Sequence, residues 1–205
     1  MTEIKLIPGG VCAAQGFTGS GIHCGIRKNR TKRDLALILS SVPASAAAVA
    51  QAHLVEIPVV PLAEDADGTL TTDAADVVRK LASRASAVLV GPGMRVSAGS
   101  CSVVSALLEA DVPLVVDADG LNCLARLTSG SLPSYPEIIR RSSPLVLTPH
   151  RGELGRLVGR TGAAAPSSLV EQLSLAREIV WADGGSELAV VSKGTATACV
   201  SVEKA

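Results

Sequence analysis

The sequence predicts an α/β fold built on a mostly parallel sheet with helices on both faces. Short, nearly all-apolar runs rich in β-branched residues recur along the chain, and stretches with helical spacing lie between them. Continuous apolar runs of this length are typical of strands buried on both faces, as in parallel sheets. Alternation of strand and helix indicates βαβ units with right-handed crossovers. The expected strands cover residues 35–39, 55–60, 87–90, 113–116, 144–147 and 188–191.

Three stretches between these strands have the spacing of helices that pack on one side. Residues 72–83 place Ala75, Val78 and Leu81 at helical spacing, and Thr72 or Asp73 could cap the first turn. Residues 97–109 and 167–181 carry apolar side chains with the same period. We therefore expect helices over these three stretches, covering the sheet.

The first fifty residues differ from the rest of the chain. They contain six glycines between residues 9 and 25 and a cationic cluster at residues 28–33. This composition predicts a short, turn-rich β segment. The composition changes near residues 42–52, so we expect two parts, residues 1–50 and residues 51–205.

Composition excludes several classes of partner. Lys and Arg number 19, as do Asp and Glu, so no net field attracts nucleic acid or an anionic membrane. The three aromatic residues, Phe17, Tyr135 and Trp181, are too few for a base-stacking surface. No apolar run approaches the roughly 20 residues that span a bilayer, and no secretory signal begins the chain. We expect a cytoplasmic protein that binds small molecules, with a homo-oligomer as one possibility.

The five cysteines favour free thiols rather than a metal site. Their number is odd, and no two of them form a C-x-x-C pair. In a cytosolic chain this pattern is typical of unpaired cysteines. We therefore expect no protein-bound metal centre of the zinc type.

Polar residues and glycines follow four successive expected strands. In open parallel sheets, ligands bind beyond the carboxyl ends of the strands. Gly91 and Gly93 follow the strand at 87–90, and together they allow close backbone approach to an anion or form a simple tight turn. Asp117, Asp119 and Asn122 follow the strand at 113–116. The two carboxylates could hold Mg²⁺ through water or bind a ribose, or Asp119 could cap the following helix.

The other two loops offer a histidine and a lysine. His150 follows Pro149 and precedes Glu153, which suits contact with a polar ligand or, alternatively, a helix start that Glu153 stabilises. Lys193 and Gly194 precede Thr195, Ala196 and Thr197, which suits contact with a phosphate or ribose. The alternative is a solvated lysine at a hairpin turn with Gly194 at positive φ. No G-x-x-x-x-G-K-[ST] motif occurs, so these loops do not form a P-loop.

In this order, the four loops resemble the motifs of one family. AVLVGPGM at 87–94, PLVVDADGLNCLA at 113–125, LVLTPHRGELGRLVG at 145–159 and VVSKGTATACVS at 190–201 look like the successive motifs of the NAD(P)H-hydrate dehydratases. The resemblance runs from about residue 53 to the end of the chain. It implies a three-layer, ribokinase-like (Rossmann-like) fold, here incomplete.

The resemblance also implies a repair reaction on a damaged cofactor. The substrate would be hydrated NADH or NADPH, and ADP or ATP with Mg²⁺ would phosphorylate its hydroxyl before phosphate leaves, as in a carbon–oxygen lyase. Carried over by motif, one set of residues would bind this substrate, and Lys193, Gly194, Thr195, Ala196 and Thr197 would contact the adenine nucleotide. The substrate-binding set is Gly91, Gly93, Asp117, Asp119, Asn122, His150 and Glu153.

One part of the family pattern does not occur in the sequence. The family continues into a G-x-G-D stretch whose amides stabilise the transferring phosphoryl group and whose Asp acts as base, and no G-x-G-D is present here. The catalytic base is therefore unassigned. We expect impaired phosphoryl transfer, because positioning alone leaves little catalysis. A catalytically inactive nucleotide-binding remnant is the alternative.

The N-terminal segment resembles a second family. Residues 7–49, from IPGGVCAAQGF to SSVPASAAAV, look like the opening of the bifunctional ornithine or glutamate N-acetyltransferases of arginine biosynthesis. That family cleaves itself before a Thr nucleophile that has no counterpart here. The resemblance implies a fused or recombined gene, and a fragment that functions with the acetyltransferases is a further alternative.

Overall fold

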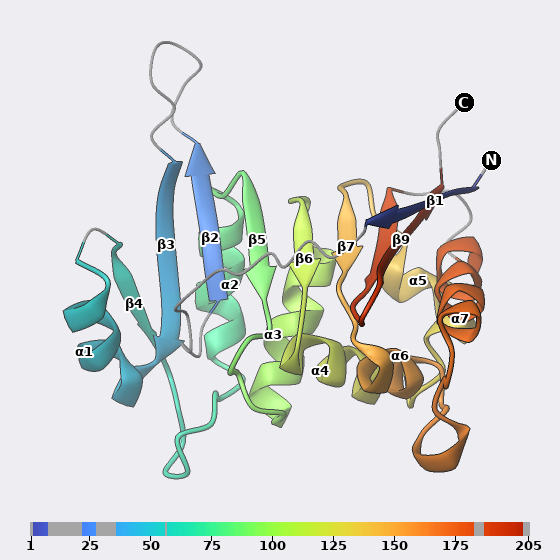
Figure 1. Cartoon of the computed structure of the whole chain (residues 1–205). Coiled ribbons are helices and arrows are strands. Elements are labelled where there is room, and N and C mark those ends of the chain that lie inside the picture. Colours follow the sequence, from blue (N-terminus) through green and yellow to red (C-terminus); the bar gives the residue numbers. More distant parts are fainter. Residues whose placement is uncertain (1, 8–21, 28–35, 56, 183–186, 203–205) are drawn as a thin grey trace.

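The computed structural model describes residues 2–7, 22–27, 36–55, 57–182 and 187–202. Within this part of the chain, nine strands form one mixed sheet in the order β1-β9-β8-β7-β6-β5-β2-β3-β4 (Figure 1). The strands are β1 (Thr2–Ile7), β2 (Ile22–Arg27), β3 (Ala36–Pro43), β4 (Val59–Leu62), β5 (Ala87–Val90), β6 (Leu114–Val116), β7 (Leu145–Leu147), β8 (Leu188–Ser192) and β9 (Thr197–Val202).

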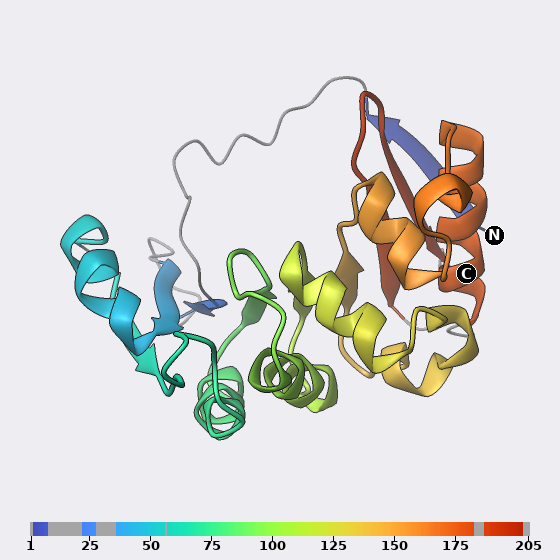
Figure 2. The same ribbon diagram turned by 90° about the horizontal axis from the view of Figure 1, so that it is seen from below.

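Helices flank this sheet, which confirms the predicted α/β class. Strands β5 to β8 pair parallel to one another, as do β3 and β4, whereas β1, β2 and β9 pair antiparallel. The helices are α1 (Ala44–His53), α2 (Ala74–Ala82), α3 (Ala98–Glu109), α4 (Asp119–Leu127), α5 (Pro136–Ile139), α6 (Arg151–Leu157) and α7 (Leu169–Ala182). Helices α2 and α3 lie side by side on one face of the sheet (Figure 2).

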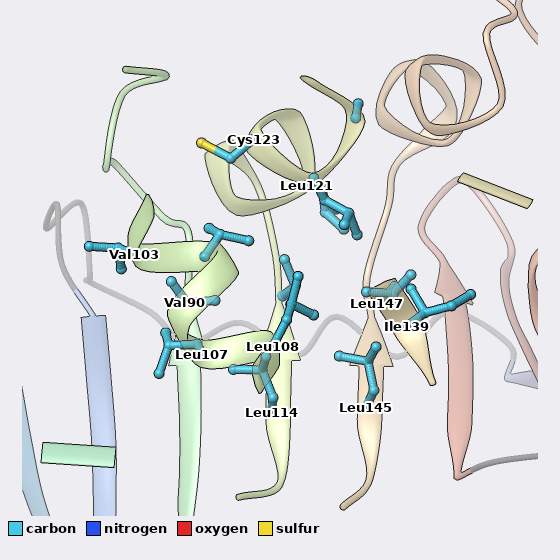
Figure 3. Packing of buried hydrophobic residues seen from close by; sticks show 14 of the residues in the cluster. Val90, Val103, Leu107, Leu108, Leu114, Leu121, Cys123, Ile139, Leu145 and Leu147 are labelled. Atoms are coloured by element: carbon cyan, nitrogen blue, oxygen red, sulfur yellow. The ribbon is translucent and has the colours of Figure 1, made fainter. Parts of the chain in front are cut away.

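The core lies between that face and the helices. Val90, Leu114, Leu145 and Leu147 alternate along β5, β6 and β7 and are at most 1% exposed. They meet buried side chains of α3, α4 and α5, including Leu107, Leu121 and Ile139 (Figure 3). Burying a large aliphatic side chain stabilises a fold by about 1.5 to 3 kcal/mol, so this layer anchors the four parallel strands.

Strands β5 to β8 are buried more deeply on one face than on the other. Leu89, Val115, Val146 and Ala189 point to the other face of the sheet and are only partly buried. Apolar composition on both faces predicted two covering layers. The described helices that pack on β5 to β8 instead share one core cluster on one face.

Most predicted elements occur where the periodicity places them, with two differences. The strand expected at 55–60 begins only at Val59, because Leu54 ends α1 and Pro58 cannot donate a ladder hydrogen bond. The second difference is α1 itself, which forms in the alanine-rich stretch around residues 50 and 51, and the expected division into two parts stays a prediction. Strands β1, β2 and β3 fit the predicted β segment, whereas the glycine-rich residues 9–21 and the cationic cluster lie outside the described residues.

No helix in the described part of the chain is long and apolar enough to cross a membrane. The expected location and oligomeric state stay predictions.

Arg141 caps the C-terminal end of α3. Its side chain donates hydrogen bonds to the carbonyl oxygens of Leu107, Leu108, Ala110 and Val112. The last carbonyls of a helix have no partner within the helix, and a cation there also interacts favourably with the helix dipole. Burial lowers the pKa of Arg141, although the nearby charge of Asp111 opposes this effect.

Replacing Arg141 by Met should therefore lower the free energy of unfolding by about 2 to 3 kcal/mol, because several half-buried carbonyls lose a charged donor. Urea denaturation followed by circular dichroism measures the change. Arg84→Met is the matched control, since Arg84 is exposed and should be neutral within about 0.5 kcal/mol. Equal stability of the two variants would contradict the proposed role of Arg141.

Candidate functional site

Four strand-end loops meet at one edge of the sheet, the lower edge in Figure 1. The parallel registers align Val90 with Val116, Val116 with Leu147, and Leu147 with Val190, so β5 to β8 end side by side. The loops that follow these four strands, together with the first turns of α4 and α6 and the first residue of β9, carry every site residue predicted from the sequence. The structure therefore brings together Gly91, Gly93, Asp117, Asp119, Asn122, His150, Glu153, Lys193, Gly194, Thr195, Ala196 and Thr197 along this edge.

Gly91 allows the first two loops to touch. Its φ is +126°, and a Cβ built on it would lie 1.8 Å from the carbonyl oxygen of Asp117 and 2.6 Å from the amide nitrogen of Gly120. Asp117 N donates to Val90 O at 3.0 Å, and Gly120 N donates to Asp117 O at 2.9 Å. Only glycine permits this approach, so the predicted tight turn also fixes the position of the aspartate loop.

Ala118 separates the two aspartates in a strained conformation. Its φ of 48° and ψ of −120° lie in a region that L-residues rarely adopt. Asp117 and Asp119 consequently point to different partners. Ala118, and not Asp119, is the N-cap of α4, so the alternative that Asp119 caps this helix is wrong. Backbone strain of this kind persists only where surrounding contacts hold it in place.

Lys193 and Asp117 form an ion pair across the ends of β8 and β6. Lys193 Nζ donates to Asp117 Oδ1, and Thr148, after β7, also hydrogen-bonds Asp117. Burial raises the pKa of Asp117. The hydrogen bonds from Lys193 and Thr148, together with the charge of Lys193, outweigh burial and hold that pKa below its ordinary value. Lys193 lies at the hairpin turn that the alternative predicted and its side chain is 41% exposed, but it is paired with Asp117, and Gly194 is not among the glycines at positive φ.

His150 and Glu153 form a capping box at the start of α6. His150 Nδ1 accepts hydrogen bonds from the amides of Gly152 at 2.9 Å and Glu153 at 3.3 Å. Glu153 Oε2 accepts from His150 N at 2.8 Å, and its Oε1 lies 3.2 Å from His150 Nε2. These partners assign the proton to Nε2. Both ring nitrogens are thus engaged within the protein, which is the helix-start role predicted as the alternative.

A chain of hydrogen bonds links the loop after β5 to helices α4 and α6. Asp119 Oδ2 accepts from the backbone amide of Arg95 at 3.0 Å, and its Oδ1 accepts from Asn122 Nδ2 at 3.2 Å. Asn122 Oδ1 accepts from Arg156 Nε at 2.8 Å. This chain joins the loop after β5, the start of α4 and the body of α6.

Three residues of this edge were not predicted as site residues. Thr148 directly follows the expected strand at 144–147, and Arg95 lies two residues after Gly93, so their position after a strand end was an available signal. Arg156 lies three residues beyond Glu153, and this spacing places both residues on the same side of α6. The sequence could not indicate that Asp117 and Asp119 have different partners, because that depends on the backbone conformation of Ala118.

The carboxylates of this edge fit a magnesium ion only together with a ligand. Within the described residues, no three His, Cys, Asp or Glu side chains gather as a metal site. Asp117 and Asp119 each already have protein partners. Mg²⁺ is commonly held by one or two carboxylates and by substrate phosphates, and these two side chains could serve in that way.

The comparisons with known proteins assign the family. The NAD(P)H-hydrate dehydratase family model matches residues 11–205, so the chain belongs to that family. Two curated relatives are both called bifunctional NAD(P)H-hydrate repair enzymes. The one from Salinibacter ruber is 43% identical over 54% of this chain and 20% of its own length. The one from Pyrobaculum aerophilum is 32% identical over 82% of this chain and 30% of its own length.

The chain therefore spans less than a third of the length of these relatives. Among solved structures, a ribokinase-like superfamily protein from Enterococcus faecalis matches with a TM-score of 0.53 and 16% identity, over 76% of this chain and 46% of that one. This likeness confirms the ribokinase-like fold. The family match covers most of residues 7–49 as well, and the resemblance of that segment to acetyltransferases stays a prediction.

Replacing Gly91 by Ala should lower the free energy of unfolding by more than about 3 kcal/mol, because the new Cβ would collide with backbone atoms that have no room to move. Gly68→Ala is the matched control. Gly68 also has positive φ, +70°, but nothing lies within 4 Å of the position that a Cβ would take there. It should lose only about 1 kcal/mol from backbone strain. Similar losses in both variants, measured by urea denaturation, would show that close approach is not the constraint.

The ion pair should make stability depend on pH in the acid range. Because the pKa of Asp117 is lowered in the folded chain, its contribution is complete above the ordinary Asp pKa and is lost as pH falls through the folded value. Lys193→Met should therefore reduce the loss of unfolding free energy between about pH 7 and pH 3 by roughly 0.5 to 1 kcal/mol, a small value because both side chains are partly exposed.

Urea denaturation at several pH values measures this difference, with Lys80→Met as the control for removal of an exposed lysine. An unchanged acid dependence in Lys193→Met would mean that the pair does not form in solution.

Proposed function

We propose that this chain binds an adenine nucleotide and hydrated NADH or NADPH along the shared edge of β5 to β8, as part of an ADP- or ATP-dependent dehydration that restores the nicotinamide ring. Family membership supports the reaction class. The observation that carries the proposal is the convergence of four family-like loops, with Lys193 beside both Asp117 and His150.

The residues divide into two groups in this proposal. The hairpin between β8 and β9, with Lys193, Gly194, Thr195, Ala196 and Thr197, contacts the adenine nucleotide. Gly91, Gly93, Asp117, Asp119, Asn122, His150 and Glu153 bind the hydrated cofactor. Asp117 and Asp119 would help to hold Mg²⁺ together with the nucleotide phosphates, and the ion would supply positive charge that neutralises part of theirs.

These side chains position ligands more readily than they transfer protons. Asp117 has a lowered pKa and is paired, and a carboxylate that is so stabilised is a weak base. His150 uses both ring nitrogens in the capping box. Neither side chain offers an uncommitted base in this arrangement. We therefore propose that turnover is impaired.

Turnover can be followed through the near-ultraviolet absorption of the reduced nicotinamide ring, starting from hydrated NADH with ATP or ADP and Mg²⁺. We expect slow or no recovery, well below the rate of about 1 per second that is common for enzymes. A rate at or above that value would contradict impaired transfer and would reveal a base that the described edge does not suggest.

A calorimetric titration with ADP and Mg²⁺ separates the two candidate functions. Binding without turnover supports the alternative of an inactive nucleotide-binding remnant. Binding with slow turnover supports the impaired dehydratase. Absence of binding by both ADP and hydrated NADH would overturn the assignment of this edge as a nucleotide site.

A further inference from the structure

Arg156, like Arg95 and Arg151, is a cation of this edge that forms no ion pair within the described residues. Lys193 is paired with Asp117, and the guanidinium of Arg95 donates to a backbone carbonyl, that of Asp67, at 2.9 Å. Arg156 donates through Nε to the neutral amide oxygen of Asn122. Within the described residues, no carboxylate lies close enough to Arg156 to form an ion pair.

The guanidinium of Arg156 is nevertheless held in place. Asn122 fixes Nε, and the orientation of the Asn122 amide is set in turn because its Nδ2 donates to Asp119. A side chain that is held through Nε keeps its two terminal nitrogens free for a further acceptor. An arginine that is oriented in this way loses less side-chain entropy when it binds.

The free end of Arg156 lies beside His150. A Cβ built on Gly152 would lie 3.0 Å from His150 Cε1 and 3.5 Å from Arg156 Nη1, so both groups approach the same point above the first turn of α6. The nearby carboxylates are already engaged, since Glu153 bonds His150 and Asp119 bonds Arg95 N and Asn122. An anion at this point would meet a free guanidinium without displacing an existing ion pair.

We propose that Arg156 binds a phosphate of the dinucleotide substrate, specifically the diphosphate that links its two nucleosides. A planar guanidinium matches two phosphate oxygens at once, and such charge-assisted pairs are about twice as strong as neutral hydrogen bonds. The assignment rests on the proposed function, because it uses the placement of the hydrated cofactor beside His150 and of the second nucleotide at the Lys193 hairpin. Asn122 is then a positioning residue that acts through Arg156.

Calorimetric titrations of the Arg156→Met variant test this inference with hydrated NADH, hydrated NADPH and ADP–Mg²⁺ as probes. Loss of the guanidinium should raise the Kd for both hydrated dinucleotides by about 10-fold or more and leave the Kd for ADP within about 2-fold. The control is Arg126→Met, an exposed arginine in the last turn of α4. It should leave all three affinities unchanged.

Three outcomes would overturn the inference. Unchanged affinity for the dinucleotides would remove Arg156 from the site, and weaker binding of ADP alone would place its phosphate on the other nucleotide. Weaker binding of hydrated NADPH alone would assign the contact to the phosphate on the ribose. Because Arg156 is exposed, the variant should keep the thermal unfolding midpoint of the unchanged chain, which excludes misfolding.

Failure of the proposed function can be distinguished from failure of this inference, since the unchanged chain would then bind none of the three probes.

Substitution of Arg156 by Lys provides a second comparison. Arg156→Lys keeps the charge but has no Nε to bond Asn122, so it should recover only part of the dinucleotide affinity. Full recovery would show that charge alone is required and that positioning by Asn122 has no role.

Discussion

The ion pair between Lys193 and Asp117 is the interaction on which the candidate site depends. It joins the ends of β8 and β6 across β7, and Thr148 from the intervening loop completes it. Without the other, Lys193 or Asp117 would lie at a strand end with a charge that no partner balances. Together they hold three loops at a fixed spacing, which parallel pairing of the strands alone does not determine.

Close backbone packing fixes the fourth loop against the same aspartate. Gly91 approaches Asp117 so tightly that only glycine fits, and Ala118 adopts a strained conformation immediately afterwards. Strain of this kind is found where a functional geometry must be held before a ligand arrives. The hydrogen bonds from Asp119 through Asn122 to Arg156 extend this order into α6. The edge is therefore held together by contacts within the protein itself.

Periodicity predicted the parallel strands, the three long helices and the shared edge, because these depend on local patterns that buried strands and amphipathic helices must satisfy. It did not predict α1, since an alanine-rich stretch has no distinct apolar face, or the antiparallel pairing of β2 with β5. The motifs placed the site residues in their loops. They could not indicate that Lys193 is paired with Asp117, because that partner is distant in the sequence, and they could not decide between ligand contact and a helix-start role for His150, because that depends on its rotamer.

Hydrogen–deuterium exchange with and without ADP–Mg²⁺ and hydrated NADH tests the central claim most directly. If the nucleotides lie across the ends of β5 to β8, amides at residues 91–95, 117–122, 148–153 and 193–197 should gain protection together, while α1 and the outer turns of α7 stay unchanged. Protection that appears away from this edge, or in none of the four loops, would contradict the claim that these strand ends form one binding site.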